Sequence, residues 1–211
     1  MKILFVQTGG TIDKDYPKTT NGWGFEISEE PAFQRLLRDK CTHRHVPPSF
    51  EYEFMTVCRK DSTEIDDFDR AELARLVGDR LLQLEQEEEQ QIGNNNDDNN
   101  NNLPFDGVVI THGTDTMAET AHFLAEQHKN KRHEILHTVP ILVTGAMLPE
   151  RFSDSDASFN LGMAIAAVQL SPPGFVGICM HGLVLKHDEI DRDADTGQFV
   201  RRLAAAQANQ A

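Results

Sequence analysis

The stretch ILFVQTGGTI, residues 3–12, decides how this chain folds, because an apolar run leads directly into a turn with two glycines and a threonine. A second stretch, VVITHGTDT at residues 108–116, repeats this arrangement about a hundred residues later. A short apolar run that ends at such a turn is typical of a buried strand. Ligands of open α/β sheets bind outside the carboxyl ends of the strands, so we expect Thr11 and Thr114 to face one crevice.

The rest of the chain alternates strand patterns with helix patterns. Apolar runs predict strands over 2–7, 52–57, 105–111, 139–144 and 175–180. Apolar residues at helical spacing predict helices over 29–39, 64–92, 115–128 and 159–170. Residues 13–24 are rich in Gly, Pro, Asn and Thr and predict a loop. This alternation predicts an α/β domain of three layers, α/β/α, with a mostly parallel sheet of the flavodoxin or Rossmann kind.

The length of 211 residues favours one domain, which we expect over residues 1–200, followed by a tail at 201–211. Residues 94–102 are all Asn or Asp and follow a glycine. A segment without apolar side chains cannot bury a core, so residues 93–102 are expected to be a disordered surface insert. Because a strand pattern resumes at Phe105, the insert interrupts the domain without dividing it.

Charge and cysteine content narrow the function classes. The formal net charge is −14, and binding to nucleic acid or anionic membranes requires clustered Lys and Arg, so we expect neither partner. Cys41, Cys58 and Cys179 lack disulfide or zinc spacing, and the last two are expected to be buried free thiols. No signal peptide or bilayer-spanning apolar segment is recognisable, which predicts a cytoplasmic protein.

Four segments, in order, together resemble the bacterial-type L-asparaginase family. TGGTI at 8–12 and ITHGTDTM at 110–117 carry most of the resemblance, and VTGAMLP at 143–149 agrees with it. RKDS at 59–62 resembles the short-chain, single-domain branch of the family. The resemblance implies a flavodoxin-like or Rossmann-like sheet. It also leads us to expect that the smaller second domain of many members is absent and that the protein is a homo-oligomer.

The resemblance further implies a set of catalytic residues. Thr11 matches the threonine usually assigned as the nucleophile, and Tyr16 follows it at the position where short-chain members carry a tyrosine. Thr114 matches a second threonine, thought to position or activate a water together with a later lysine. Arg192 stands at that lysine's place. Arginine stays protonated and cannot act as a base, although it can hold charge and orient Thr114.

Substrate-binding residues follow from the same resemblance. Asp115 matches the acidic residue that binds the substrate's α-amino group, and Asp61 and Ser62 match the segment that holds its α-carboxylate and α-amino group. Asp115 also fits a helix cap, and the segment at 61–62 also fits an ordinary capped loop. Gly10 and Gly113 lack the β carbons that would keep a substrate from the backbone.

The remaining titratable residues give no cofactor site. His112 is expected to be hydrogen-bonded structurally at a strand end. His43 and His45 have no third ligand close in sequence. The acidic residues of 188–195 lack the glycine and closing glutamate of an EF-hand, so a solvated loop is expected. The sequence thus predicts an enzyme without metal or organic cofactor.

Two classes of function remain open from the sequence. The first is an L-asparagine amidohydrolase that releases aspartate and ammonia through a threonine nucleophile, with amide hydrolysis on a tRNA-borne substrate as a related variant that the acidic charge disfavours. The second is a non-catalytic amino-acid-binding or degenerate homologue, which Arg192 and the expected absence of a second domain favour.

Overall fold

A computed structural model describes residues 1–19, 22–41, 48–92, 105–127, 135–193 and 195–202. Its centre is one six-stranded sheet, in the order β10-β9-β8-β7-β1-β6. All neighbours in this sheet pair in parallel except β9 and β10, which pair antiparallel. The six strands are β1 (Lys2–Gly9), β6 (Glu51–Lys60), β7 (Gly107–Thr111), β8 (Ile141–Thr144), β9 (Val176–Met180) and β10 (Leu183–Lys186).

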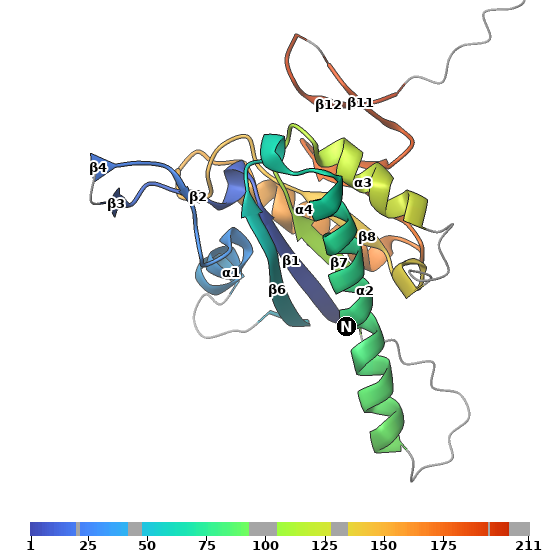
Figure 1. The fold of residues 1–211 in the computed structure, drawn as a ribbon. Coiled ribbons are helices and arrows are strands. Elements are labelled where there is room, and N and C mark those ends of the chain that lie inside the picture. The colour runs from blue at the N-terminus through green and yellow to red at the C-terminus, as the bar shows by residue number, and fades with distance from the viewer. Residues whose placement is uncertain (20–21, 42–47, 93–104, 128–134, 194, 203–211) are drawn as a thin grey trace, which may run out of the picture.

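Helices cover both faces of the sheet (Figure 1). On one face, Leu4 and Val6 of β1 share a buried cluster with α2 (Asp67–Ile92) and α3 (Met117–Glu126). On the other face, Ile3 and Phe5 share a cluster with α1 (Ala32–Leu36) and α4 (Ala157–Leu170). Successive side chains of a strand point to opposite faces, so an unbroken apolar run is what a strand buried on both sides requires. The predicted three-layer α/β/α fold is confirmed.

The strand order places the two motif strands side by side at a switch point. From β1 the chain continues to β6 on one side of β1, and it then returns to β7 on the other side. Loops that leave such neighbouring strands in opposite directions open a crevice at the carboxyl edge. β1 and β7 pair in register from Ile3 opposite Gly107 to Gln7 opposite Thr111, so the turns after them begin at the same level.

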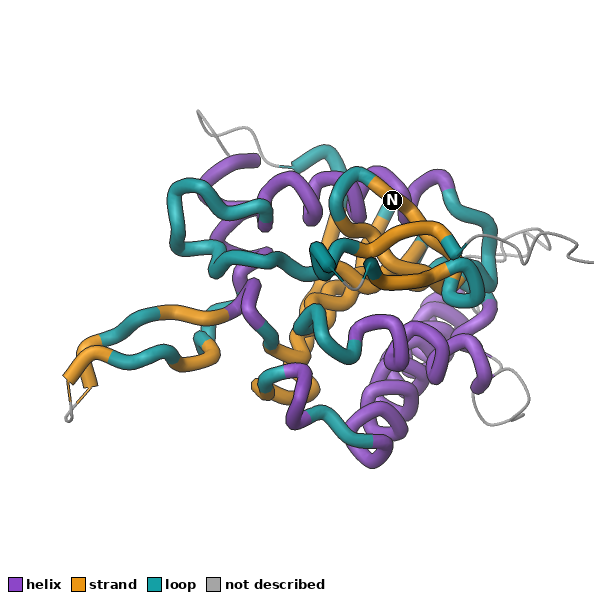
Figure 2. Tube along the Cα trace, turned by 90° about the horizontal axis from the view of Figure 1, so that it is seen from above, coloured by secondary structure: helices purple, strands orange, loops and turns teal. Residues whose placement is uncertain are grey.

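The predicted loop over residues 13–24 is wrong in part. A 3₁₀ turn at Thr11–Asp13 leads into an arm of two short antiparallel pairs, which projects from the body in both views (Figures 1 and 2). Each strand has two residues, too few to show an alternating pattern in sequence. The pairs are β2 (Lys14–Asp15) with β5 (Glu26–Ile27), and β3 (Lys18–Thr19) with β4 (Gly22–Trp23).

The helix boundaries also differ from the sequence-based ones. The helix predicted over 29–39 is a five-residue α-helix followed by a π-helical turn at Leu37–Cys41. Pro31 precedes the first turn as its N-cap residue, as its lack of an N–H allows. The helix predicted from 115 begins at Met117, because Asp115 and Thr116 make contacts in the preceding turn.

The region after β9 holds strands that the sequence pattern did not reveal. β10 is the antiparallel edge strand, and β11 (Ile190–Arg192) pairs with β12 (Phe199–Arg201) in a separate hairpin. The expected acidic loop is therefore partly strand, and Asp193 closes its turn by accepting hydrogen bonds from Asp195 and Thr196. In the portions of the chain that the structure describes, no helix is long and apolar enough to span a membrane.

Some of the predicted features lie in parts of the chain that the structure does not describe. The Asn/Asp-rich segment, the pair His43 and His45, and the tail beyond Arg202 lie outside the described residues. Cys179 is a buried free thiol as expected, whereas Cys58 is only half-buried. Burial raises the pKa of the Cys58 thiol to about 11, so this thiol is protonated at neutral pH.

Candidate active site

The turns after β1 and β7 touch through their glycines. A β carbon built on Gly10 would lie 2.2 Å from the amide nitrogen of Gly113, so no other side chain fits between the two backbones. Gly10 also has a φ of 82°, a conformation that favours glycine. The strand ends are tied as well, because the Thr8 hydroxyl donates a 2.8 Å hydrogen bond to the carbonyl of Thr111. The two motif turns are therefore in contact, and the expectation that Thr11 and Thr114 face one crevice stays a prediction.

Ser62, at the end of β6, adds a third turn to this contact. A β carbon on Gly113 would lie 2.6 Å from the β carbon of Ser62. Ser62 is buried, and its hydroxyl accepts a hydrogen bond from the amide of Asp115 and donates one to the carboxylate of that residue. The hydroxyl of Thr116 bonds the carbonyl of Ser62 at 2.7 Å. The predicted residues Gly10, Ser62, Gly113 and Asp115 are therefore linked by direct contacts, with the two glycines and Ser62 buried and Asp115 exposed.

The two threonines differ in their surroundings. Thr11 is half-buried at the start of the 3₁₀ turn, immediately after Gly10. Within the described residues its hydroxyl has no hydrogen-bond partner, which leaves it available to a ligand. Thr114 is 8% exposed and follows Gly113 directly. The two threonines therefore differ in exposure, with Thr11 half-buried and Thr114 almost enclosed.

Arg192 reaches the second turn from the hairpin β11–β12. Its Nη1 lies 3.1 Å from the carbonyl oxygen of Thr114 and 3.5 Å from the carboxylate of Asp115. Its Nε donates to the carbonyl of Gly197, and its guanidinium lies 5.4 Å from the ring centroid of Phe199. Arg192 is thus fixed next to Thr114, but its contact there is with the main chain.

Asp115 does not cap the helix that follows it. The N-cap residue of α3 is Thr116, and no side chain makes a capping hydrogen bond there. The carboxylate of Asp115 instead lies between Ser62 and Arg192 and is more than half exposed. Its role in the structure is thus to join the turn after β7 to Ser62 and to Arg192.

Asp61 has a structural partner as well as a place at the site. It is the N-cap of a 3₁₀ turn at Ser62–Glu64, with the reciprocal bonds of a capping box to the side chain of Glu64. Its carboxylate also pairs with the ammonium of Lys14 at 2.6 Å. The hydrogen bond from Lys14 lowers the pKa of the Asp61 carboxyl. Lys14 was not predicted, and it joins the base of the arm to the turn at Ser62–Glu64.

Tyr16 lies on the projecting arm. Its side chain is 49% exposed, and its ring centroid lies 5.0 Å from that of Phe25. The ring of Tyr16 thus packs against another residue of the arm.

His112 is structural, as expected. Its Nδ1 lies 2.8 Å from the carbonyl of Gly113, so this nitrogen carries the proton, and Nε2 accepts from the Thr120 hydroxyl at 2.9 Å. The Thr120 oxygen accepts in turn from Nε of Arg70. Complete burial lowers the pKa of His112 to about 4, so the ring is neutral and holds the turn before Thr114.

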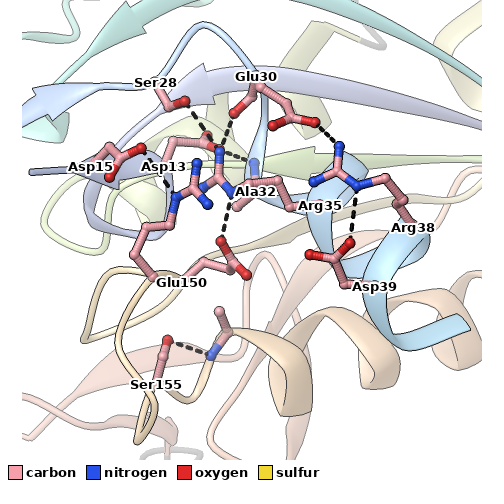
Figure 3. Close-up of polar contacts among 12 residues, drawn as sticks. Asp13, Asp15, Ser28, Glu30, Ala32, Arg35, Arg38, Asp39, Glu150 and Ser155 are labelled. Carbon is pink, nitrogen blue, oxygen red and sulfur yellow. Dashed lines mark hydrogen bonds and ion pairs between the residues drawn. The ribbon is translucent and has the colours of Figure 1, made fainter. Parts of the chain in front are cut away.

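Two buried charged residues behind the first turn were missed by the sequence analysis (Figure 3). Arg35 of α1 is fully buried; its Nε donates to Glu150 at 2.7 Å, and its Nη1 donates to Ser28 and to the carbonyl of Glu30. Asp13, at the end of the 3₁₀ turn, is also fully buried. Charged residues are almost never fully buried unless paired, so pattern reasoning assigns both to the surface.

The third motif segment supports the site from behind. Asp156 accepts hydrogen bonds from the amides of Met147 and Leu148, and Asn160 of α4 bonds the carbonyl of Gly145. A β carbon on Gly145 would lie 2.3 Å from the carbonyl oxygen of His112. The segment after β8 therefore packs directly against the second motif. The described parts of the chain contain no group of three or more His, Cys, Asp or Glu side chains arranged to hold a metal ion.

Comparisons with known proteins identify the family and the fold. The family model described as "Asparaginase, N-terminal" matches residues 2–192. The chain is 33% identical over 192 residues to a glutaminase-asparaginase of Acinetobacter glutaminasificans and 29% identical over 187 residues to an L-asparaginase of Thermococcus kodakarensis. These alignments cover 89% and 88% of this chain and 46% of each relative, so the chain spans about half the length of these relatives. The solved thermostable L-asparaginase of T. kodakarensis has the same fold, with a TM-score of 0.66 and 21% identity over 100% of this chain and 59% of that one.

Proposed function

The chain belongs to the asparaginase family, and we propose that it is an amidohydrolase that converts L-asparagine to aspartate and ammonia with Thr11 as nucleophile. The observation that carries the proposal is the direct contact of three turns through Gly10, Gly113 and Ser62. Gly10 is followed by Thr11, and Gly113 is followed by Thr114 and Asp115. The contact therefore brings together the turns that carry the groups a small zwitterionic amide needs: a hydroxyl nucleophile, a second threonine and a carboxylate for the ammonium group.

The proposed reaction has two steps. The Oγ of Thr11 attacks the side-chain carbonyl carbon, an ester bond forms, and the C–N bond breaks as ammonia leaves with the proton that the hydroxyl gave up. Water then attacks the ester carbon, aspartate leaves, and the Thr11 hydroxyl is restored. Thr114 positions that water, and Asp115 binds the substrate ammonium. N–H groups of the turns stabilise the negative oxygen of each intermediate, where one donor contributes about 3 kcal/mol to lowering the barrier.

The test is ammonia release from L-asparagine by the wild-type chain, Thr11→Ala and Thr114→Ala. We expect turnover in the wild type and its loss in both variants. Thr11→Ser is the matched control, because it keeps a hydroxyl at the same atom and retains measurable turnover if the hydroxyl is the nucleophile. Full activity in Thr11→Ala would rule out the assigned nucleophile, and no release by the wild type would rule out the proposed activity.

A second candidate, a non-catalytic amino-acid-binding homologue, is favoured by Arg192. A guanidinium remains protonated and takes no proton from Thr114, and its Nη1 bonds the main-chain carbonyl of that residue. If this candidate is right, aspartate or asparagine should raise the melting temperature of the chain without any release of ammonia. A ligand that binds only the native state stabilises that state. The variant Arg192→Lys distinguishes the two candidates. Lysine restores a titratable amine at this position, so turnover rises only if the arginine limits catalysis.

Other properties remain predictions. A small-molecule substrate, a homo-oligomeric assembly and a cytoplasmic location follow from the sequence alone. A choice between asparagine and glutamine depends on one methylene of pocket length, which is worth about 1–3 kcal/mol.

A further inference from the structure

Asp13 is a fully buried carboxylate that the proposed reaction does not use. It ends the 3₁₀ turn Thr11–Asp13, two residues after the proposed nucleophile. One carboxylate oxygen accepts a 2.6 Å hydrogen bond from the amide of Ala32, the first residue of α1. The other accepts a 3.1 Å hydrogen bond from the hydroxyl of Thr111. Figure 3 shows Asp13 beside Ala32 and Arg35 in this interior.

The contact with Thr111 links the two halves of the site. Thr111 is the last residue of β7 and stands three positions before Thr114. A single carboxylate therefore bridges the end of the turn that carries Thr11 and the end of the strand that carries Thr114. The strand-to-strand bond from Thr8 to Thr111 lies before the first turn, so Asp13 supplies the corresponding tie after it.

The main chain on either side of Thr11 is held by separate bonds. The amide of Gly10 donates to the carbonyl of Lys60, and the amide of Glu150 donates to the carbonyl of Ile12. The amide of Asp13 closes the turn on the carbonyl of Gly10, and the carbonyl of Asp13 accepts from Ser28. Among the described residues, the carboxylate of Asp13 ties the turn to α1 through Ala32 and to β7 through Thr111, and the Gln7 side chain of β1 adds a further hydrogen bond.

Burying the carboxylate of Asp13 costs folding free energy, which argues that its position has a structural purpose. Burial raises the pKa of Asp13 to about 6, against the hydrogen bonds from Ala32 and Thr111 and the charge of Arg35, which lower it. Among the described contacts no hydrogen bond joins Arg35 to Asp13: Nε and Nη1 of Arg35 donate to Glu150, Ser28 and Glu30, and its buried Nη2 has no hydrogen-bond partner.

We propose that Asp13 is a positioning residue that fixes the turn of Thr11 against the turn of Thr114, so that the two hydroxyls keep the spacing the reaction needs. This inference rests on the proposed amidohydrolase function. It concerns geometry and not proton transfer, because Asp13 is enclosed behind the turn and has no exposed surface.

A positioning role predicts different effects for two substitutions of Asp13. Asn keeps both bonds, since its oxygen accepts from Ala32 and its amide group donates to the Thr111 hydroxyl, which can rotate. Ala removes both bonds and frees the turn from β7. Val139→Ala is the matched control, because Val139 is buried in the core before β8, at the opposite end of the strands from the motif turns, and its truncation loosens the fold without touching them.

The experiment compares kcat and KM for asparagine in the wild type, Asp13→Ala, Asp13→Asn and Val139→Ala, each checked for folding by circular dichroism. We expect Asp13→Ala to lower kcat about 10- to 100-fold with KM within about twofold, because misplaced groups weaken the transition state more than ground-state binding. Asp13→Asn should recover most of that loss, and Val139→Ala should keep the wild-type kcat.

A folded Asp13→Ala variant with wild-type kcat would overturn the proposal, and so would equal losses in the Ala and Asn variants. Amide hydrogen exchange over residues 8–14 and 111–116 provides a readout that does not depend on activity. We expect faster exchange in both segments in Asp13→Ala than in Asp13→Asn. If the wild type releases no ammonia, the proposed function fails, and unchanged exchange in Asp13→Ala would then refute the positioning role separately.

Discussion

His112 should make the stability of this chain fall in mild acid, and the size of the effect follows from its hydrogen bonds. The neutral ring donates from Nδ1 to Gly113 and accepts at Nε2 from Thr120. A second proton on the ring would remove the acceptor and place a charge in a fully buried site. The perturbation is a change of pH from 7.5 to 4.5, compared between the wild type and His112→Gln, which does not titrate.

The magnitude comes from the pKa of His112, which burial lowers from 6.5 to about 4. Between these values the unfolded chain binds a proton that the folded chain excludes, so the free energy of unfolding falls as the pH falls. The contribution of neutral His112 is complete above pH 6.5. At pH 4.5, about two pH units below the unfolded-state pKa, the free energy of unfolding has fallen by about 2–3 kcal/mol.

Urea unfolding at pH 7.5, 6.0 and 4.5 measures this effect. The wild type should lose about 2–3 kcal/mol more than His112→Gln over this interval. Carboxylates elsewhere titrate in both proteins, so the difference between the two pH profiles isolates the histidine. Parallel profiles would refute the inferred neutral, buried ring.

Three further predictions concern other contacts of the site. Arg35→Met leaves the largely buried Glu150 without its ion-pair partner and should lower the free energy of unfolding by about 3–5 kcal/mol in urea titrations, whereas a loss below about 1 kcal/mol would contradict the buried pair. Gly113→Ala forces a β carbon to within 2.6 Å of that of Ser62, so ammonia release and the melting temperature should both fall, and normal values of both would show that the turns separate freely. Lys14→Met breaks an ion pair with Asp61 whose side chains are about one-third exposed. Thermal melts should show that the free energy of unfolding falls by at most about 1 kcal/mol, and by less in high salt. A larger loss that does not depend on salt would show that Lys14 does more than pair with Asp61.

The layers of the fold and the meeting of the two motifs were predictable because both depend on short, local patterns. The apolar runs before Thr8 and His112 identify strands buried on both faces, and glycine-rich turns at their ends identify the edge where ligands bind. Gly10 and Gly113 are glycines because each backbone lies against its neighbour, and that requirement is visible in the sequence as a glycine at a strand end.

The features that the sequence did not reveal depend on partners far along the chain. Arg35 has a helical pattern around it, but nothing local indicates that Glu150 lies 2.7 Å away to offset its burial. Asp13 stands at the start of a segment that predicts a loop, and its burial depends on Ala32 and Thr111. Two-residue strands such as β2 and β5 carry too little pattern to be distinguished from a loop.

The contact of Gly10, Ser62 and Gly113 has a consequence for the order in which the candidate site forms during folding. Neighbouring members of this set are separated by 52 and 51 residues, and each follows a different parallel strand. Contacts between such distant segments form late, since the loops that join them must be closed first. No partly folded chain that lacks β6 or β7 contains all three turns, so their contact would form in the last stage of refolding, after the circular dichroism signal of the helices has returned.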